Sequence, residues 1–315
     1  MTALRYGILS TSSISPRFVA AVRAANAGQI LAVSSRTGEK AREKASQWGI
    51  PRAYGSHGEL LADQDVNIVY ISSVNSQHYP MAKAALEAGK HVICEKPCTT
   101  AAAQTRELYE TAREKGLFFM EAEKRLFLPA LLELRRRIEA GFLGEIYMAE
   151  MSHSFSDTYN NWMFDPDIGG GPLLSSGIYA AHLLIWLFGP IRDIRGVGSK
   201  LETGIPWQYV LSGETESGVL FNAKNSTRAI LDNTARIFGT KGWAEIAEYW
   251  KARKVIFHIP GKEPEEQQFP CAHELRYEAE HIKACFEAGL LNSPVVTQEL
   301  SVQGIAALEK VIESW

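Results

Sequence analysis

Residues 7–18 read GILSTSSISPRF, and this stretch decides the fold class of the N-terminal part of the chain. The apolar run at 6–9 predicts a buried strand, and the Ser15-Pro16 pair predicts the first turn of a helix. Between such a strand and helix, dinucleotide-binding proteins carry glycines in the pattern G-x-G-x-x-G/A. Here the three glycine positions hold Ser10, Ser12 and Ser15. The stretch is therefore either a cofactor site with unusual residues or a strand-turn-helix that binds no cofactor.

The overall composition predicts a two-domain globular protein. A chain of 315 residues is too long for one typical hydrophobic core. Its 46% hydrophobic and 22% charged residues are ordinary for soluble proteins. The net charge of −3 gives no support for binding to nucleic acid or to a membrane surface. We expect no segment of about 18 apolar residues that could span a bilayer, and no room for a signal peptide before the first strand.

The cysteines predict neither disulfides nor a metal site. Cys94, Cys98, Cys271 and Cys285 are too few for a disulfide framework. Cys94 and Cys98 are four residues apart, but no second pair or histidine stands at zinc spacing. This usage of cysteine fits a reducing compartment, so we expect a cytoplasmic protein.

In the first 120 residues, short apolar runs alternate with amphipathic helical patterns. Strands are predicted at 6–9, 30–34, 52–54, 66–72, 91–94 and 117–120, and helices at 15–26, 38–48, 56–62, 77–88 and 101–115. Continuous apolar strands separated by helices indicate a parallel sheet covered on both faces. This is the doubly wound Rossmann arrangement, whose ligands bind beyond the carboxyl ends of the strands.

After residue 129 the pattern changes. A helix is predicted at 130–140, a strand at 145–154, and a helix at 172–188 after the loop SDTYNNWMFDPDIGGG. Alternating residues from 194 to 257 indicate antiparallel strands, and two helices are predicted at 274–288 and 297–314. The expected fold class is therefore α/β, with a dinucleotide-binding domain at 1–124 and an α+β domain at 125–315. The second domain is expected to contain a large open, mostly antiparallel sheet, and its closing helices could pack back on the first domain.

Residues 74–97 read VNSQHYPMAKAALEAGKHVICEKP and run between the ends of two predicted strands. Lys96 therefore stands beside the expected cofactor groove, where partial burial would lower its pKa by disfavouring the charged form. A surface lysine in a loop fits the spacing equally well. Asn75 and His78 follow the preceding strand, where they would touch the cofactor, cap the helix or serve only the structure.

The sequence SSRT at 34–37, after the second predicted strand, bears on the choice of cofactor. NAD sites commonly place Asp or Glu there to bind the ribose 2′-hydroxyl. No acid stands at this tip, whereas Ser35 and Arg36 would accept a 2′-phosphate, with Arg42 one turn further on. The sequence therefore favours NADP(H) over NAD(H), against the alternative of a solvated turn.

Several motifs resemble the Gfo/Idh/MocA family, which includes glucose–fructose oxidoreductase and inositol dehydrogenase. They are AGKHVICEKP at 88–97, GGGPL at 169–173 and GTKG at 239–242. The stretches YGSHGELL at 54–61 and FFMEAEKRLFLPA at 118–130 are most similar to the branch of dimeric dihydrodiol dehydrogenase and related NADP-dependent sugar dehydrogenases. The resemblance covers essentially the whole chain.

The resemblance implies an NADP(H)-dependent oxidoreductase that acts on a sugar, cyclic polyol or dihydrodiol-like molecule. Lys96 is then the catalytic lysine. The family's D-x-G-x-H motif appears here as SSGIY at 175–179, so Ser175 replaces the Asp and Tyr179 stands at the His position as the proton-transfer residue. The ammonium of Lys96 would lower the pKa of Tyr179 from its usual value of about 10.

Other candidate residues keep more than one interpretation. His182, three residues after Tyr179 on one helical face, would orient Tyr179, carry a proton itself, or be a buried structural histidine. The loop before the three glycines suits either a carbohydrate or a dimer contact. The candidates to line the substrate pocket are Tyr159, Asn161, Trp162, Lys124 and Arg125.

Serine is the smallest polar substitute for glycine, and its hydroxyl can donate to a phosphate oxygen. The loop after the first strand is therefore predicted to be a serine version of the phosphate loop. The predicted cofactor contacts are Ser10, Thr11, Ser12, Ser13, Ile14, Ser35, Arg36, Ser72, Ser73, Asn75, His78, Glu95 and Lys96.

Two expectations concern assembly and activity. The resemblance implies a homodimer or homotetramer formed through the sheet of the second domain. The alternative to an enzyme is a non-catalytic NADP(H)-binding regulator or sensor of the same fold, which the missing glycines and the missing Asp favour.

Overall fold

The computed structural model of the chain describes residues 3–156 and 161–315. The chain divides into two compact units, one formed by 1–124 with 273–298 and the other by 125–272 with 299–315. The second unit therefore differs from the predicted domain at 125–315, because the segment 273–298 belongs to the first unit.

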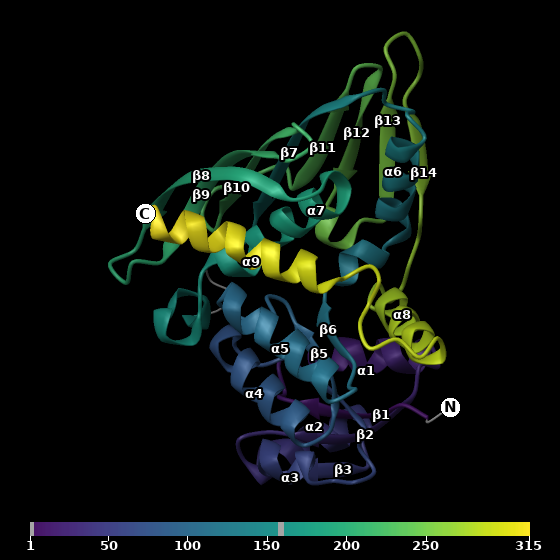
Figure 1. Cartoon of the computed structure of the whole chain (residues 1–315), viewed down its shortest axis with the longest axis vertical. Helices are drawn as coiled ribbons and strands as arrows, with labels where there is room; N and C mark the ends of the chain where they lie inside the picture. Colours follow the sequence, from purple (N-terminus) through teal and green to yellow (C-terminus); the bar gives the residue numbers. More distant parts are fainter. Residues whose placement is uncertain (1–2, 157–160) are drawn as a thin grey trace. The chain divides into compact units, whose positions relative to one another are not determined.

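The first unit is built on a six-stranded parallel sheet with the order β3-β2-β1-β4-β5-β6 (Figure 1). Its strands are β1 (Arg5–Leu9), β2 (Gln29–Ser34), β3 (Arg52–Tyr54), β4 (Ile68–Ile71), β5 (His91–Glu95) and β6 (Phe119–Ala122). Its helices are α1 (Ser15–Ala24), α2 (Gly38–Trp48), α3 (His57–Leu61), α4 (Asn75–Glu87), α5 (Ala102–Glu114) and α8 (Arg276–Glu287). The strand order reverses between β1 and β4, which is where Rossmann sheets bind dinucleotides. The predicted Rossmann fold is confirmed.

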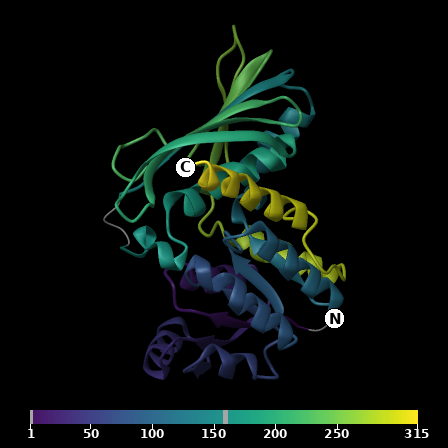
Figure 2. The same ribbon diagram turned by 60° about the vertical axis from the view of Figure 1, so that its left-hand side comes forward.

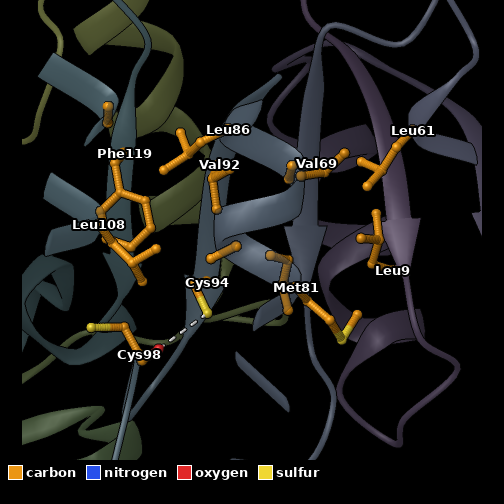
Figure 3. Packing of buried hydrophobic residues seen from close by; sticks show 14 of the residues in the cluster. Leu9, Leu61, Val69, Met81, Leu86, Val92, Cys94, Cys98, Leu108 and Phe119 are labelled. Atoms are coloured by element: carbon orange, nitrogen blue, oxygen red, sulfur yellow. Dashed lines mark hydrogen bonds between the residues drawn. The ribbon is translucent and has the colours of Figure 1, made fainter. Parts of the chain in front are cut away.

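Both faces of this sheet are packed. On one face, residues of α3, α4 and α5 cover a buried cluster that includes Leu9, Val69 and Phe119 (Figure 3). On the other face, the ring of Phe18 from α1 stacks on Tyr70 of β4 with ring centroids 3.7 Å apart. Because no face is solvated, the strands read as continuous apolar runs rather than as alternating ones.

Two cysteines belong to the cluster of Figure 3. Cys94 and Cys98 are fully buried, and Cys94 Sγ lies 3.7 Å from the carbonyl oxygen of Cys98. Burial raises the pKa of both thiols, and the charge of Glu121 acts in the same direction. Both are free thiols that pack as small apolar residues. Within 3–156 and 161–315, no group of three or more His, Cys, Asp and Glu residues is placed to hold a metal ion.

The second unit is built on an eight-stranded sheet with the order β14-β13-β12-β11-β7-β10-β9-β8 (Figure 1). Its strands are β7 (Ile146–Ser154), β8 (Ile191–Lys200), β9 (Pro206–Thr215), β10 (Leu220–Ser226), β11 (Thr234–Gly239), β12 (Gly242–Ala247), β13 (Lys254–His258) and β14 (Glu265–Gln268). Strands β7 and β10 run parallel, and the other neighbouring pairs are antiparallel. The predicted open, mostly antiparallel sheet is confirmed.

Helices α7 (Ile178–Phe188) and α9 (Gln298–Glu313) lie along one face of this sheet (Figures 1 and 2). They approach closely at Gly304, where a Cβ atom would lie 2.5 Å from Nε2 of His182. After α9, the indole Nε1 of Trp315 donates to the carbonyl oxygen of Gly196 in β8 at 2.7 Å. A third helix, α6 (Pro129–Glu139), packs at β13 through Arg137, which stacks on Phe257.

Among the described residues, the segment Pro166–Phe188 is long and apolar enough to cross a membrane by length and composition alone. The expectation that no segment reaches this apolar length was therefore wrong. Of its most apolar window, 78% is buried inside the protein, which is also typical of the core helix of a soluble protein. The segment is not one regular helix either, because a 3-10 turn and a π-turn precede α7.

Candidate functional site

The loop after β1 has the backbone conformation that a phosphate loop needs. Ser10 has a φ of 94°, in the left-handed region that normally favours glycine. The N-cap residue of α1, Ile14, makes no side-chain cap, and Pro16 lies in the first turn. Pro16 has no N–H, and the N–H groups of Ser15 and Arg17 donate to the carbonyl oxygens of Ser12 and Ile14 at 3.2 and 3.0 Å. What α1 offers an anion beside the loop is therefore the positive end of its helix dipole.

The serine at the third glycine position is a structural link. Ser15 is fully buried, and its Oγ lies 2.9 Å from Oγ of Ser72, just after β4. The same hydroxyl donates to the carbonyl oxygen of Ser10 at 3.1 Å. Ser72, which was predicted to contact the cofactor, is also buried, and its hydroxyl forms this hydrogen bond with Ser15. Ser13 at the tip of the loop is exposed, and Thr11 and Ser12 are partly exposed.

These features fit the pyrophosphate of a dinucleotide. The positive φ of Ser10 reproduces the tight turn of a glycine, and the positive end of the α1 helix dipole lies beside the loop. The residues that would hold the group are the backbone of 10–14 together with the hydroxyls of Thr11, Ser12 and Ser13.

The tip of β2 carries cationic side chains. Ser35 is buried, and its N–H donates to the carbonyl oxygen of Tyr54 at 3.2 Å, whereas Arg36 is exposed. The side chain of Arg42 lies over the start of α2. A Cβ atom added at Gly38 would be only 3.1 Å from Nη1 of Arg42. Two guanidinium groups therefore lie near the end of β2, and the sequence SSRT at this end contains no acid.

His78 holds the E-K-P motif in place. Its Nδ1 lies 2.7 Å from the carbonyl oxygen of Pro97, and its Nε2 lies 3.0 Å from that of Ser73. The ring is 1% exposed, and burial lowers its pKa. The prediction that His78 touches the cofactor is thereby corrected: both ring nitrogens face backbone carbonyls, so the ring joins the segment after β4 to the one after β5.

Asn75 is the first residue of α4 and is buried. The N-cap residue is Val74, and it makes no side-chain cap. The interpretation of Asn75 as a helix cap is therefore wrong. Ser73 and Lys96, at the ends of the two neighbouring strands, are both partly exposed.

A cluster of charged groups surrounds Lys96 within the first unit. Tyr70 donates to Oε1 of Glu95 at 2.5 Å, and burial raises the pKa of Glu95 against the opposing charge of Lys96. Nζ of Lys124 lies 3.2 Å from Oε1 of Glu274, which also pairs with Arg17 of α1. Burial lowers the pKa of Lys124 to about 8, and the charges of Arg17 and Lys96 act in the same direction.

Glu278 of α8 is the deepest member of this charged cluster. It is fully buried, and neither of its carboxylate oxygens has a hydrogen-bond partner among the described residues. Burial raises its pKa well above the usual range, and the charges of Glu95 and Glu123 add to this effect. Burial therefore favours the neutral form of this carboxyl over the ionised one.

In the second unit, Tyr179 lies in the first turn of α7. A π-turn at Leu173–Gly177 directly precedes this helix, and such turns are frequent at functional sites. The hydroxyl of Ser175 donates to the carbonyl oxygen of Gly171 at 2.9 Å, so the serine in the Asp position closes the turn after the three glycines. Tyr179 is partly exposed, and the guanidinium carbon of Arg125 lies 4.2 Å from its ring centroid.

His182 lies one turn further along α7 and has no exposed surface. Its ring edge faces Gly304 of α9, where a side chain would leave no room. Its predicted catalytic role is therefore corrected. A histidine with no exposed surface cannot meet a substrate, whereas the other two interpretations, a residue that orients Tyr179 and a buried structural histidine, both fit the structure.

The remaining predicted pocket residues come from both units. Lys124 belongs to the first unit and Arg125 to the second. Trp162 is partly exposed in the 3-10 turn Asn161–Phe164. Tyr159 lies outside the described residues. The predicted group is therefore only partly placed by the structure.

Sequence reasoning missed an aromatic platform in the second unit, made of His153, Phe155 and Trp250. The ring centroids of His153 and Trp250 are 4.1 Å apart, and those of His153 and Phe155 are 5.4 Å apart. Tyr249, next to Trp250, lies 5.8 Å from the guanidinium of Arg125, which also covers Tyr179. The available signal was the spacing of His153 and Phe155, which are two residues apart at the end of a predicted strand.

Models of known families match both parts of the chain. The model described as an oxidoreductase family with an NAD-binding Rossmann fold matches residues 4–123. The model of the GFO/IDH/MocA C-terminal domain matches residues 131–245. The chain belongs to the Gfo/Idh/MocA oxidoreductase family.

The alignments with named relatives cover nearly the whole chain. Trans-1,2-dihydrobenzene-1,2-diol dehydrogenase of Bos taurus is 35% identical over 306 residues, which are 93% of this chain and 91% of the relative. The human protein of the same name is 33% identical over 305 residues, with 93% and 91% covered. The family and these relatives show that the chain is an NAD(P)-dependent oxidoreductase of the dehydrogenase type.

Solved structures agree on the fold. Levoglucosan dehydrogenase in complex with NADH and levoglucosan superposes with a TM-score of 0.89 at 18% identity, covering 99% of this chain and 97% of the other. A 3-ketoreductase from Actinomadura kijaniata in complex with TDP-benzene and NADP superposes with a TM-score of 0.87 at 22% identity. This match covers 98% of this chain and 97% of the other. The two-part architecture of the Gfo/Idh/MocA family is therefore present in full.

The buried carboxyl of Glu278 gives a testable pH dependence of stability. Its pKa is raised in the folded state, so its contribution is fully present below the unfolded pKa of about 4 and is lost as the pH rises towards the folded pKa. Glu278→Gln cannot ionise. We therefore expect the melting temperature of Glu278→Gln, measured relative to that of the wild type, to be higher at pH 8 than at pH 5 by about 2 °C or more.

Differential scanning fluorimetry at both pH values measures this gain. Glu280→Gln, a carboxylate on the same helix that pairs with Arg276, is the matched control and should show no such gain. If the melting temperatures of Glu278→Gln and the wild type differ by the same amount at pH 5 and at pH 8, Glu278 does not titrate with a raised pKa.

Proposed function

We propose that this protein is an NADP(H)-dependent dehydrogenase acting on a secondary alcohol, or the corresponding carbonyl, of a sugar, cyclic polyol or cyclic diol. The observation that carries the proposal is Tyr179, at the family's proton-transfer position, lying partly exposed beneath a buried cation. The aromatic platform of His153, Phe155 and Trp250 in the same unit offers apolar faces to a ring-shaped substrate. The diol named for the relatives and the sugar ligand named for a solved neighbour support this substrate class.

The chain's own residues handle the proton of the reaction. A nicotinamide cofactor held by the loop at 10–14 would supply the hydride acceptor for oxidation of the alcohol and the hydride donor for reduction of the carbonyl. Tyr179 takes the proton of the substrate hydroxyl during oxidation and gives it back during reduction. Lys96 assists as a hydrogen-bond donor to the reacting oxygen, held at the end of β5 by the His78 contact to Pro97.

The alternative of a non-catalytic sensor receives less support. The missing glycines and the missing Asp favoured it, but Ser10 adopts the glycine-like φ and Ser175 takes over a hydrogen bond of the turn. A sensor has no need of the Lys96 and Tyr179 pair, and the relatives are named dehydrogenases.

Removing either proton-transfer group should slow turnover. We expect Tyr179→Phe and Lys96→Ala each to lower kcat by at least about tenfold, because such groups typically contribute a hundredfold or more. The change in absorbance of the reduced nicotinamide, with a panel of sugars, polyols and cyclic diols, measures this. Affinity for NADPH, followed by its fluorescence, should stay near that of the wild type.

Tyr109→Phe is the matched control for the loss of a hydroxyl. Tyr109 lies in α5 of the first unit, with its ring packed on Phe119, and the variant should keep wild-type turnover. Near-normal kcat in both Tyr179→Phe and Lys96→Ala, on a substrate that the wild type converts, would contradict the proposed roles.

The preference for NADP(H) rests on the tip of β2. Arg36 is exposed there, Arg42 lies over the start of α2, and the sequence SSRT contains no acid to meet a ribose 2′-hydroxyl. A guanidinium matches the geometry of a phosphate. We therefore assign the 2′-phosphate of NADP(H) to Ser35 and Arg36.

Replacing Arg36 should affect one cofactor only. We expect Arg36→Ala to weaken NADPH binding by about tenfold or more, because hydrogen bonds to charged groups contribute roughly 1.5–3 kcal/mol. NADH lacks the 2′-phosphate, so its affinity for the same variant is the internal control and should change little. Isothermal titration calorimetry with both cofactors decides this, and an equal loss for both would remove Arg36 from the 2′-phosphate site.

We also propose that the protein is a homodimer or homotetramer formed through the open face of the eight-stranded sheet. This face exposes Val197, Val210 and Leu220, which are 73%, 47% and 50% exposed. Val197 lies opposite Val210 across β8 and β9, and Leu220 lies opposite the exposed Met148 across β10 and β7. Apolar side chains exposed on one face of a sheet are typical of interaction sites.

Light scattering after size exclusion tests the assembly. The wild type should have a mass that is a multiple of 34.9 kDa, and Val210→Glu should shift it towards 34.9 kDa, because a buried unpaired carboxylate is costly. Thr240→Glu, at a turn outside this face, should leave the mass unchanged. A wild-type mass of 34.9 kDa at micromolar concentration would contradict the proposal.

A further inference from the structure

Arg125 is the largest fully buried side chain among the described residues. It lies in the 3-10 turn η1 (Lys124–Phe127), at the start of the second unit. Its guanidinium carbon is 4.2 Å from the ring centroid of Tyr179 on α7 and 5.8 Å from that of Tyr249 in η6 (Tyr249–Lys251). A cation that carries its charge at every physiological pH therefore lies between two tyrosine rings, away from water.

Burying such a cation is expensive unless negative potential surrounds it. The faces of aromatic rings supply part of this potential, more strongly in a desolvated site. The attraction increases when one ring becomes a phenolate, because a full negative charge then lies beside the guanidinium at low effective dielectric. Arg125 therefore favours the ionised form of Tyr179 over the neutral one.

The same unit contains a stack that serves structure alone. Arg137 of α6 lies 4.3 Å from the ring centroid of Phe142 and 5.1 Å from that of Phe257. Its charge is met by Glu133, 2.9 Å away, and its rings cannot ionise. At Arg125, by contrast, one of the two rings is the tyrosine that the proposed function uses for proton transfer.

We propose that Arg125 is a positioning residue for Tyr179, which fixes its ring and stabilises the phenolate that accepts the substrate proton. This inference rests on the proposed function of Tyr179. It replaces the prediction that Arg125 contacts the substrate, because a side chain without exposed surface cannot do so. Oxidation of the alcohol gains most from the contact, since Tyr179 must then start as the proton acceptor.

The kinetic test compares a variant that lacks the positive charge at position 125 with one that keeps it. We expect Arg125→Met to lower kcat for alcohol oxidation by at least about tenfold, as for other preorganised electrostatic groups, with KM for substrate and cofactor changed less than about threefold. Arg125→Lys keeps the charge and should recover part of kcat. Arg125→Gln, which is neutral and planar, serves as the second neutral variant if Arg125→Met does not fold.

Arg137→Met is the matched control, because it removes an arginine stacked on two rings in the same unit. It should lower the melting temperature but leave kcat near that of the wild type. If Arg137→Met lowers kcat as much as Arg125→Met does, the effect is a general loss of stability and the inference is overturned. The inference is also overturned if Arg125→Lys has the melting temperature of the wild type but a kcat no higher than that of Arg125→Met and Arg125→Gln.

A second measurement does not depend on turnover. In a double-mutant cycle of Arg125→Met and Tyr179→Leu, the melting temperature of the double variant should fall by less than the sum of the two single losses. Additive losses would show that the two side chains are not coupled and would overturn the inference.

The failure of the inference and that of the proposed function are distinguishable. If Tyr179→Phe abolishes turnover while Arg125→Met and Arg125→Gln retain it, the proposed function stands and the role of Arg125 is refuted. If Tyr179→Phe retains turnover, the proposed function fails and the role of Arg125 in proton transfer fails with it, whatever the cycle shows about packing.

Discussion

The hydrogen bond between Ser15 and Ser72, 2.9 Å long, joins the two segments that the cofactor site depends on. Ser15 starts α1 after the loop of β1, and Ser72 follows β4, so the bond spans the point where the strand order reverses. Because Ser15 also donates to the carbonyl oxygen of Ser10, it helps to hold that residue in a conformation usually reserved for glycine. Serine thus replaces glycine here without loss of the turn, and its hydroxyls add links that glycine lacks.

Desolvated charge is the second constraint on this molecule. In the first unit, burial opposes the ionisation of Glu95, Glu278 and Lys124. In the second unit, the buried guanidinium of Arg125 lies against the rings of Tyr179 and Tyr249. Each unit therefore holds a buried ionisable group beside its proposed catalytic residue.

The sequence predicts most of the first unit because its parallel strands are buried on both faces and its helices carry one apolar stripe. The roles of His78 and His182 could not be read in this way, since they depend on the carbonyl oxygen of Pro97 and on Gly304, which are 19 and 122 positions away. The π-turn before Tyr179 depends on a hydrogen-bond register that composition does not encode. The return of 273–298 to the first unit likewise depends on tertiary packing, here of α8.

The most direct test is calorimetric titration of the wild-type protein with NADPH and, under identical salt and pH, with NADH. A serine phosphate loop beside Arg36 and Arg42 predicts that both reduced cofactors bind and that NADPH binds at least about tenfold more tightly, the factor that roughly 1.4 kcal/mol supplies. Binding of neither cofactor would contradict the assignment of the loop at 10–14 as a phosphate site. Equal affinities would contradict the assignment of Arg36 to the 2′-phosphate.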